Sequence, residues 1–315
     1  MKELKIKNHS TGRREFLTKL SAAAALGLIG VAGVKGVSAA DHTSDSGKPE
    51  SAMPTITLGS HRISRLICGS NPILGYSYMG HHTDRQMREY YTMERTVEFL
   101  QTCEHAGITT HQASSRHDYL SLLRERGSKL QIICLDSEQE KIKETIKIAQ
   151  PIAMVHHGGV TDRLFAEGNS KLVHNYVKAV KDCGLMAGVS AHNPNVIKQI
   201  ANEGWEVDFF MTCFYFLTRN LEKEETMPII PVGSYNFFKD DPRVMTQVIR
   251  QVKQPCLAFK ILGAGRLCSS EEKVRAAFQF AFENIKPTDG VIVGMFPWFF
   301  DEIGANVQYA EEFGI

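Results

Sequence analysis

Short apolar runs alternate with amphipathic stretches from residue 55 to the end of the chain. Eight runs are present, covering residues 65–70, 108–113, 130–135, 152–157, 185–190, 207–213, 256–261 and 289–294. The stretches between them have helical spacing, as at Thr96, Val97, Leu100 and Cys103. Repeated strand and helix units of this kind build parallel sheets. Eight of them within residues 54–315 predict an α/β fold, the (β/α)8 barrel. An open doubly wound sheet is the alternative, but no GxGxxG motif follows the first run.

The first forty residues have the zones of an export signal in the expected order. Arg13 and Arg14 precede an apolar, alanine- and glycine-rich stretch at 21–34, and small residues follow at 37–40. The segment resembles a bacterial twin-arginine signal, with cleavage expected after Ala39 or Ala40. We therefore expect a signal peptide at 1–40, a flexible polar linker at 41–53 and one barrel domain at 54–315. The expected location is the periplasm or another exported site, and the twin-arginine export machinery is the expected partner.

Charge and apolar run length narrow the classes of ligand. The formal net charge of +1 provides no field that would gather a nucleic acid. The longest apolar run, residues 22–34, is shorter than the roughly 20 residues that span a bilayer. We therefore expect a small-molecule substrate, with no nucleic acid partner and no membrane span in the mature form.

The seven cysteines do not have the pattern of a disulfide scaffold. Their number is odd, no CxxC pair occurs, and most lie within apolar runs. We expect them to be buried and reduced.

Several segments resemble those of one enzyme superfamily. Residues 55–66 are similar to the hairpin that closes the barrel floor in aldo-keto reductases. Residues 106–108, 188–194, 259–265 and 293–295 are similar to the superfamily's signatures at strands two, five, seven and eight. The resemblance runs from about residue 54 to 314. It implies an aldo-keto-reductase-like barrel with an N-terminal floor hairpin.

The residues that would carry aldo-keto reductase chemistry are substituted. That family uses Asp, Tyr, Lys and His at the ends of strands two to four. The resemblance implies that Gln112 takes the place of the Asp, His117 that of the Tyr and Asp136 that of the Lys, while His156 keeps the place of the His. Hydride transfer would therefore need another proton donor.

The cofactor side is also altered. Ser190 stands where the family contacts nicotinamide, and Asn306 matches a late cofactor-contacting Asn. Residues 294–298 replace the polar, Arg-bearing loop that grips the NADP 2′-phosphate. The resemblance thus favours NADP less than it would for an unmodified member of the family.

The replacement residues suggest acid–base or metal chemistry. Asp136, His156 and His192 are expected to end three neighbouring strands at the barrel mouth, where active sites of this fold lie. A carboxylate with two imidazoles is a ligand set for Zn, Mn or Fe. The alternatives are hydrogen-bonded structural histidines and a helix-capping carboxylate.

Other candidates also follow strand ends or lie on long aromatic loops. Lys260 would form a Schiff base, bind a substrate carboxylate or hydroxyl, or form a salt bridge with an aspartate. Tyr215 would be a proton donor or part of an aromatic wall. Asn71, Gln112, His117 and Trp298 are candidate substrate contacts, with Trp298 stacking on a sugar ring or packing its loop.

Three functions remain open from the sequence. The first is an exported enzyme acting on a small polyhydroxylated or keto-bearing substrate, such as a sugar, as a lyase, isomerase or hydrolase. It would use His156, Asp136 and His192 for proton transfer, with or without a divalent metal. The second is an oxidoreductase that keeps NADP tightly bound, and the third is a non-catalytic ligand-binding barrel.

Overall fold

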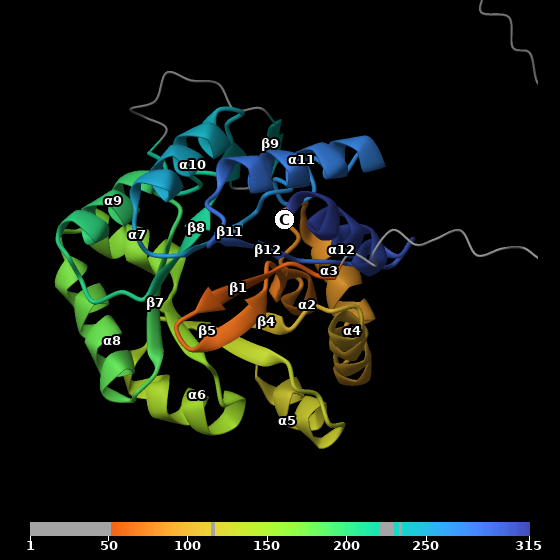
Figure 1. Cartoon of the computed structure of the whole chain (residues 1–315), viewed down its shortest axis with the longest axis horizontal. Coiled ribbons are helices and arrows are strands. Elements are labelled where there is room, and N and C mark those ends of the chain that lie inside the picture. The colour runs from red at the N-terminus through yellow and green to blue at the C-terminus, as the bar shows by residue number, and fades with distance from the viewer. Residues whose placement is uncertain (1–51, 115–116, 221–229, 233–234) are drawn as a thin grey trace, which may run out of the picture. The chain divides into compact units, whose positions relative to one another are not determined.

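The computed structural model describes residues 52–114, 117–220, 230–232 and 235–315. The predicted signal at 1–40 and nearly all of the predicted linker lie outside these residues. Eight parallel strands close into a barrel in the order β11-β12-β3-β4-β5-β6-β7-β8 (Figure 1). They are β3 (Leu66–Gly69), β4 (Thr110–Ser114), β5 (Gln131–Asp136), β6 (Ala153–His156), β7 (Met186–Ala191), β8 (Phe209–Cys213), β11 (Cys256–Phe259) and β12 (Gly290–Val293). The predicted (β/α)8 barrel is confirmed, and each predicted run overlaps one of its strands.

Helices surround the strands, and four of them, α4, α9, α11 and α12, begin at residues whose side chains cap them. Asn193 accepts a hydrogen bond from the Asn195 amide ahead of α9, and Ser270 accepts one from the Lys273 amide ahead of α11. The helices are α2 (Asn71–Leu74), α3 (His81–Tyr90), α4 (Met93–His105), α5 (Asp118–Glu125), α6 (Ile142–Ala149), α7 (Gly158–Ala166), α8 (Ser170–Asp182), α9 (Pro194–Asn202), α10 (Asp241–Gln251), α11 (Glu271–Asn284) and α12 (Glu302–Phe313), with a short 3-10 turn at Gln139–Lys141. A small hairpin of β9 (Ile230–Val232) and β10 (Tyr235–Phe237) lies between β8 and α10 in sequence.

An antiparallel hairpin of β1 (Thr55–Leu58) and β2 (His61–Ser64) closes the end of the barrel where the strands begin (Figure 1). Its turn contains Gly59 at a φ of +58°, where a Cβ would lie 2.4 Å from the Met186 sulfur at the start of β7. Ile56, Leu58 and Ile63 pack against the barrel interior. The predicted floor hairpin is therefore confirmed.

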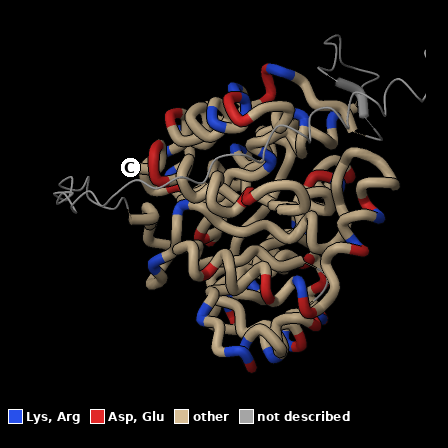
Figure 2. Tube along the Cα trace, turned by 90° about the vertical axis from the view of Figure 1, so that its right-hand side faces the viewer, with Lys and Arg blue, Asp and Glu red and all other residues tan. Residues whose placement is uncertain are grey.

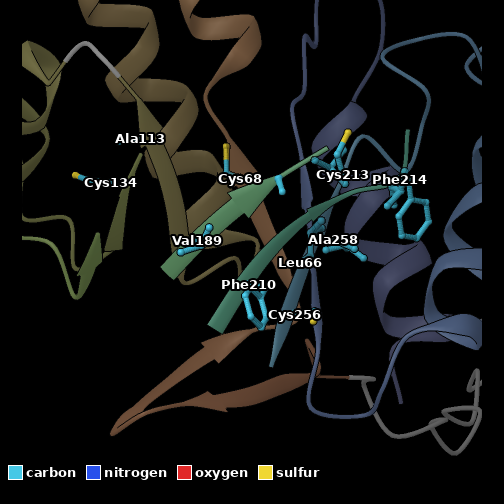
Figure 3. Close-up of a cluster of buried hydrophobic side chains, with 14 of the residues drawn as sticks. Leu66, Cys68, Ala113, Cys134, Val189, Phe210, Cys213, Phe214, Cys256 and Ala258 are labelled. Atoms are coloured by element: carbon cyan, nitrogen blue, oxygen red, sulfur yellow. The ribbon is translucent and has the colours of Figure 1, made fainter. Parts of the chain in front are cut away.

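Two apolar layers follow from the alternation of side chains along the strands. Inward residues such as Ile67, Ile133 and Phe209 fill the barrel. Outward residues such as Cys68, Val189 and Phe210 pack under the helices (Figure 3). Whether a side chain at a strand end reaches the barrel mouth therefore depends on whether it belongs to the inward or the outward set.

The outer elements carry charged residues of both signs. Positive and negative residues are interspersed over them (Figure 2). Within the described ranges, no helix has the length and apolar character to cross a membrane.

All seven cysteines are free, and five are buried as expected, but Cys183 and Cys268 are exposed. These two lie after α8 and ahead of α11, beyond the apolar strands that bury the others.

Candidate active site

Two adjoining pockets lie at the end of the barrel where the strands finish. The outer pocket has a volume of about 1030 Å³ and is lined by residues from α2, α3 and the ends of β4, β5 and β6. The inner pocket has a volume of about 240 Å³ and lies among the ends of β3, β11 and β12. Asn71, Tyr76 and Tyr78 line both. The two pockets therefore share a wall.

His157, and not its neighbour His156, lines the outer pocket. Ala153 and Val155 of β6 belong to the barrel interior, so the alternation turns His157 inward and His156 outward. The His157 side chain is exposed at the pocket, but desolvation by the surrounding protein lowers its pKa, and the nearby His192 and Lys260 lower it further. A lowered pKa favours the neutral imidazole, which is able to act as an acid–base group.

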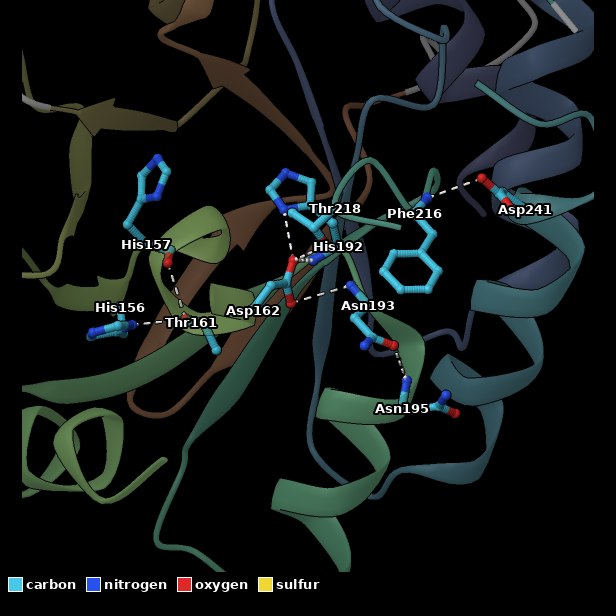
Figure 4. A network of polar contacts seen from close by, with 10 residues as sticks. All are labelled: His156, His157, Thr161, Asp162, His192, Asn193, Asn195, Phe216, Thr218 and Asp241. Carbon is cyan, nitrogen blue, oxygen red and sulfur yellow. Dashed lines mark hydrogen bonds and ion pairs between the residues drawn. The ribbon is translucent and has the colours of Figure 1, made fainter. Parts of the chain in front are cut away.

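His156 lies outside the strand ring, contrary to the expected position at the mouth. Its Nδ1 is 2.7 Å from Thr161 Oγ1, which itself donates to the His157 carbonyl. The His156 Nδ1 proton is therefore donated to Thr161 (Figure 4). The ring also meets Tyr176 of α8 edge-on at 5.1 Å. Burial lowers the pKa of His156 to about 4, as for a neutral structural histidine.

His192 follows β7 and is held by a buried carboxylate, Asp162 of α7. The His192 amide donates to Asp162 Oδ2 at 2.9 Å, and its ring Nδ1 lies 3.1 Å from the same oxygen (Figure 4). The Thr218 hydroxyl donates to this oxygen at 2.8 Å, and the Asn193 amide donates to Oδ1 at 3.3 Å. The contact between the His192 ring and Asp162 Oδ2 favours a proton on Nδ1, which leaves Nε2 as the reactive nitrogen.

The environment of His192 opposes its protonation. Burial lowers its pKa, Asp162 acts in the opposite direction, and Lys260 lowers the pKa further. Gly158, the first residue of α7, allows the close approach of helix and strand. A Cβ there would lie 2.8 Å from Ser190 Oγ and 3.2 Å from His192 Cε1.

Lys260 follows β11 and lines the inner pocket. Its Nζ lies 4.5 Å from the centre of the Tyr78 ring and 4.9 Å from that of Phe259. The expected alternative of an aspartate salt bridge is not found, because Asp208 pairs with Lys181 and Asp136 binds backbone amides. Among the described residues, Lys260 has no carboxylate within ion-pair distance.

Asp136 lies at the outer pocket but caps its own loop. Its Oδ1 accepts from the amides of Ser137 at 2.6 Å and Glu138 at 3.1 Å. Within the described ranges, no three His, Cys, Asp or Glu side chains are placed to hold a metal ion. The expected convergence of Asp136, His156 and His192 on Zn, Mn or Fe is therefore not found. The outward turn of His156 accounts for this.

The predicted substrate contacts are distributed between the two pockets. Asn71 lines both, Gln112 lines the inner pocket and His117 lines the outer one. The Gln112 amide donates to the Ala113 carbonyl at 2.8 Å, so its side-chain oxygen remains an acceptor. Burial lowers the pKa of His117. Its Nε2 is buried without a hydrogen-bond partner in the part of the chain that the structure describes.

His192 does not line either pocket, and neither do four other predicted residues. Tyr215 packs against Phe237, and burial raises its pKa to about 12. Trp298 is 52% exposed and meets Tyr90 edge-on. Ser190 and Asn306 are buried, Ser190 beside α7 and Asn306 within α12.

The residues of the inner pocket do not fit the phosphates of NADP. Its volume is below the roughly 300–1,000 Å³ of most small-molecule sites. Lys260 is the one Lys or Arg among its described lining residues, and the carboxylate of Glu302 lines the same pocket. One lysine does not supply the several cations that the phosphates of NADP need, so the lining does not fit that cofactor.

Sequence reasoning missed Asp162 and Thr218 and named His156 in place of His157. Strand alternation indicates that only one of these two neighbouring histidines faces the mouth, but not which one. Nothing local marks Asp162, which lies in the first turns of a helix and reaches His192 only after α7 packs on β7.

Comparison with known proteins agrees with the fold. No family model matches the chain, and no curated protein matches its sequence. The holo form of an aldo-keto reductase from Bacillus halodurans is similar at 14% identity and a TM-score of 0.51, covering 82% of this chain and 91% of that one. A glycerol dehydrogenase from Gluconobacter oxydans is similar at 14% identity and a TM-score of 0.42, covering 69% of this chain and 66% of that one. A truncated 3-deoxy-D-arabino-heptulosonate 7-phosphate synthase from Thermotoga maritima has 11% identity and a TM-score of 0.48, with coverage of 84% and 91%. The similarity to the Bacillus halodurans enzyme agrees with the TIM-barrel fold.

Proposed function

We propose that this protein is an enzyme that moves protons on a small polyhydroxylated or keto-bearing substrate, such as a sugar. The observation that carries the proposal is the contact of His192 with the buried Asp162, close to His157, which lines the outer pocket. A carboxylate that orients an imidazole is a common arrangement for general base catalysis. The reaction class that fits is isomerisation, epimerisation or aldol cleavage, because each begins with proton removal next to a carbonyl or from a hydroxyl.

The chemistry requires two groups that act on opposite ends of a C–H and C=O unit. His192 Nε2 takes the proton from the carbon next to the carbonyl, and Asp162 stabilises the imidazolium that forms. The electron pair of the broken C–H bond forms a C=C bond, and the carbonyl oxygen gains the negative charge. Neutral His157 donates its N–H to that oxygen, as suits an imidazole with a lowered pKa. In epimerisation the proton returns to the same carbon on its opposite face. In isomerisation it is added to the former carbonyl carbon, while the hydroxyl on the other carbon gives its proton to His157 and becomes the new carbonyl.

The outer pocket suits a polyhydroxylated molecule. Three tyrosines line it, and Tyr78 and Tyr235 lie 5.4 Å apart at a tilt of 56°. Aromatic faces pack against the C–H faces of sugars, while carboxylates accept hydrogen bonds from hydroxyl groups. The carboxylates that line this pocket are Asp84, Asp118, Asp136, Glu138 and Glu144.

We also propose that the enzyme acts outside the cytoplasm. The paired Arg13 and Arg14 and the apolar stretch at 21–34 support export by the twin-arginine route. An exported compartment supplies little free NADP(H), which agrees with chemistry that uses no nicotinamide.

The test is the exchange of substrate hydrogen with solvent. Aldoses, ketoses and their acids are incubated in D2O with the protein, and loss of the C–H signal next to the carbonyl is followed by NMR. We expect exchange with at least one compound, and a loss of at least 100-fold with His192→Gln or His157→Gln. The exposed His105, at the end of α4, provides the matched control variant His105→Gln, which keeps full activity.

Two outcomes contradict the proposal. Exchange that survives both mouth histidine variants places the chemistry elsewhere. Binding of sugars without exchange in any compound of the series leaves a ligand-binding barrel.

A further inference from the structure

We infer that the inner pocket binds a carboxylate, so that the substrate is a small sugar acid or keto acid. The inference rests on the proposed function for the location of the chemistry and adds the class of substrate. It comes from Lys260, Ser70 and Asn71, none of which the proton-transfer step uses.

Lys260 presents a cation with no anion beside it. Its ammonium group lies over two aromatic rings and has no carboxylate within 4.0 Å among the described residues. Cation–π contacts compensate only part of the lost hydration of an ammonium group. The residue also has a φ of +60°, a left-handed conformation that costs a non-glycine residue about 1 kcal/mol or more. Strain of this kind persists where it places a side chain for function.

Neutral hydrogen-bond donors line the same pocket as this cation. Ser70 is 1% exposed, lines the inner pocket, and its hydroxyl has no partner among the described residues. The Asn71 side chain lines both pockets and likewise has no hydrogen bond to the described part of the chain. A buried hydroxyl without a partner costs about 1–3 kcal/mol, which a bound acceptor would recover. An ammonium, a hydroxyl and an amide are together a donor set for a carboxylate.

The single carboxylate of the inner pocket does not compete for the ligand site. Glu302 is directed to its own loop, where its Oε2 accepts from the Phe296 amide at 2.7 Å. Burial raises the pKa of Glu302. Apolar side chains, including Ile261, Leu262 and Phe296, form much of the remaining wall. A charge pair inside this wall is screened less than one in water.

The distribution of charge over the two pockets would orient a sugar acid. Lys260 is at the inner end, whereas five carboxylates line the outer pocket. Lys141 is the one Lys or Arg among the described lining residues of the outer pocket, and it pairs with Glu138. The acid group of the ligand is attracted inward, and its hydroxyl groups meet acceptors outside. The carbon between them passes the shared wall of Asn71 and Tyr78, near His157.

The experiment compares acids with neutral sugars on the same protein. D-glucuronate, D-galacturonate, D-gluconate and pyruvate are titrated into the protein and followed by ligand-observed NMR, with D-glucose and D-galactose as neutral partners. We expect at least one acid to bind at least tenfold tighter than either neutral sugar. Lys260→Met should remove that difference, whereas Lys260→Arg should restore at least part of it. Lys129→Met is the matched control, because Lys129 is exposed just ahead of β5, at the end of the barrel where the strands begin. It should keep the preference.

The outcomes separate this inference from the proposed function. Equal binding of acids and neutral sugars, or no acid bound below 10 mM, overturns the inference. A preference for acids that Lys260→Met leaves unchanged also overturns it. Because Lys260→Met removes only a side chain at the mouth, circular dichroism should show the barrel intact. If Lys260→Met does not fold, Ser70→Ala provides the test, because it keeps Lys260 and should weaken acid binding severalfold. Lys260-dependent acid binding without hydrogen exchange at His192 would retain the carboxylate site and refute the proton-transfer chemistry.

Discussion

Acid should destabilise the barrel through His156, and the size of the effect follows from its surroundings. The ring is buried between β6 and α8, and its pKa is lowered to about 4 from 6.5. Because the unfolded chain binds the proton more tightly, stability rises with pH between about 4 and 6.5 and falls as the pH decreases through that range. The loss is absent above pH 7 and reaches about 2 kcal/mol at pH 5 for this one residue.

The variant His156→Asn isolates this contribution. Asn retains a donor near the position of Nδ1, and hence the contact with Thr161, but it does not titrate. Urea unfolding at pH 7.5 and at pH 5 gives the stability of wild type and variant. We expect the variant to lose about 2 kcal/mol less than wild type between these pH values, although its smaller side chain lowers stability at both.

A matched variant makes the result specific. His105→Asn changes an exposed histidine at the end of α4 and should lose the same stability as wild type on acidification. If His156→Asn and wild type respond equally to pH, the ring of His156 is accessible to protons in the folded state. The outward, buried placement of His156 would then be wrong.

Three further changes test the site and the export signal. Asp162→Asn removes the charge that raises the pKa of His192, so NMR titration should give a still lower pKa for His192. The weakened hydrogen bonds should also lower the free energy of unfolding by about 1–3 kcal/mol. An unchanged titration would show that the carboxylate does not act on the ring. Gly158→Ala should displace the His192 ring and lower thermal stability, equivalent to about 1–3 kcal/mol, because its Cβ would lie 3.2 Å from His192 Cε1. Gly159→Ala should be nearly neutral, since its nearest contact is 3.4 Å, and equal effects of both variants would contradict the close approach of helix and strand. Lysine at both positions of the arginine pair at 13–14 should leave the precursor in the cytoplasm on cell fractionation, and normal export would remove the twin-arginine assignment.

The position of the chemistry within the fold was predictable in outline. Strand ends of a (β/α)8 barrel meet at one mouth, so residues that follow predicted strands were sound candidates. Asn71, Gln112, Asp136 and Lys260 all line a pocket there, as does His117. Tyr215 also follows a strand, but it turns into the packing against Phe237.

The choice between His156 and His157 needed the register of the barrel. Strands of a parallel barrel are buried on both faces, so their sequences are continuous apolar runs that do not indicate which residues face inward. Residues 152–155 are all apolar, and either histidine after them could have pointed to the mouth. The packing of Ala153 and Val155 inside the barrel resolves the ambiguity.

The sequence by itself determined the elements and their order, because helix and strand periodicities are local properties of the chain. It determined the eight strands, the floor hairpin and the end of the barrel where the site lies. Tertiary structure alone decided which side chains meet, because hydrogen bonds such as that between Asp162 and His192 join residues 30 positions apart. Such a contact forms only when a helix has packed on its strand, and its energy depends on distances of a few ångströms that no local pattern records.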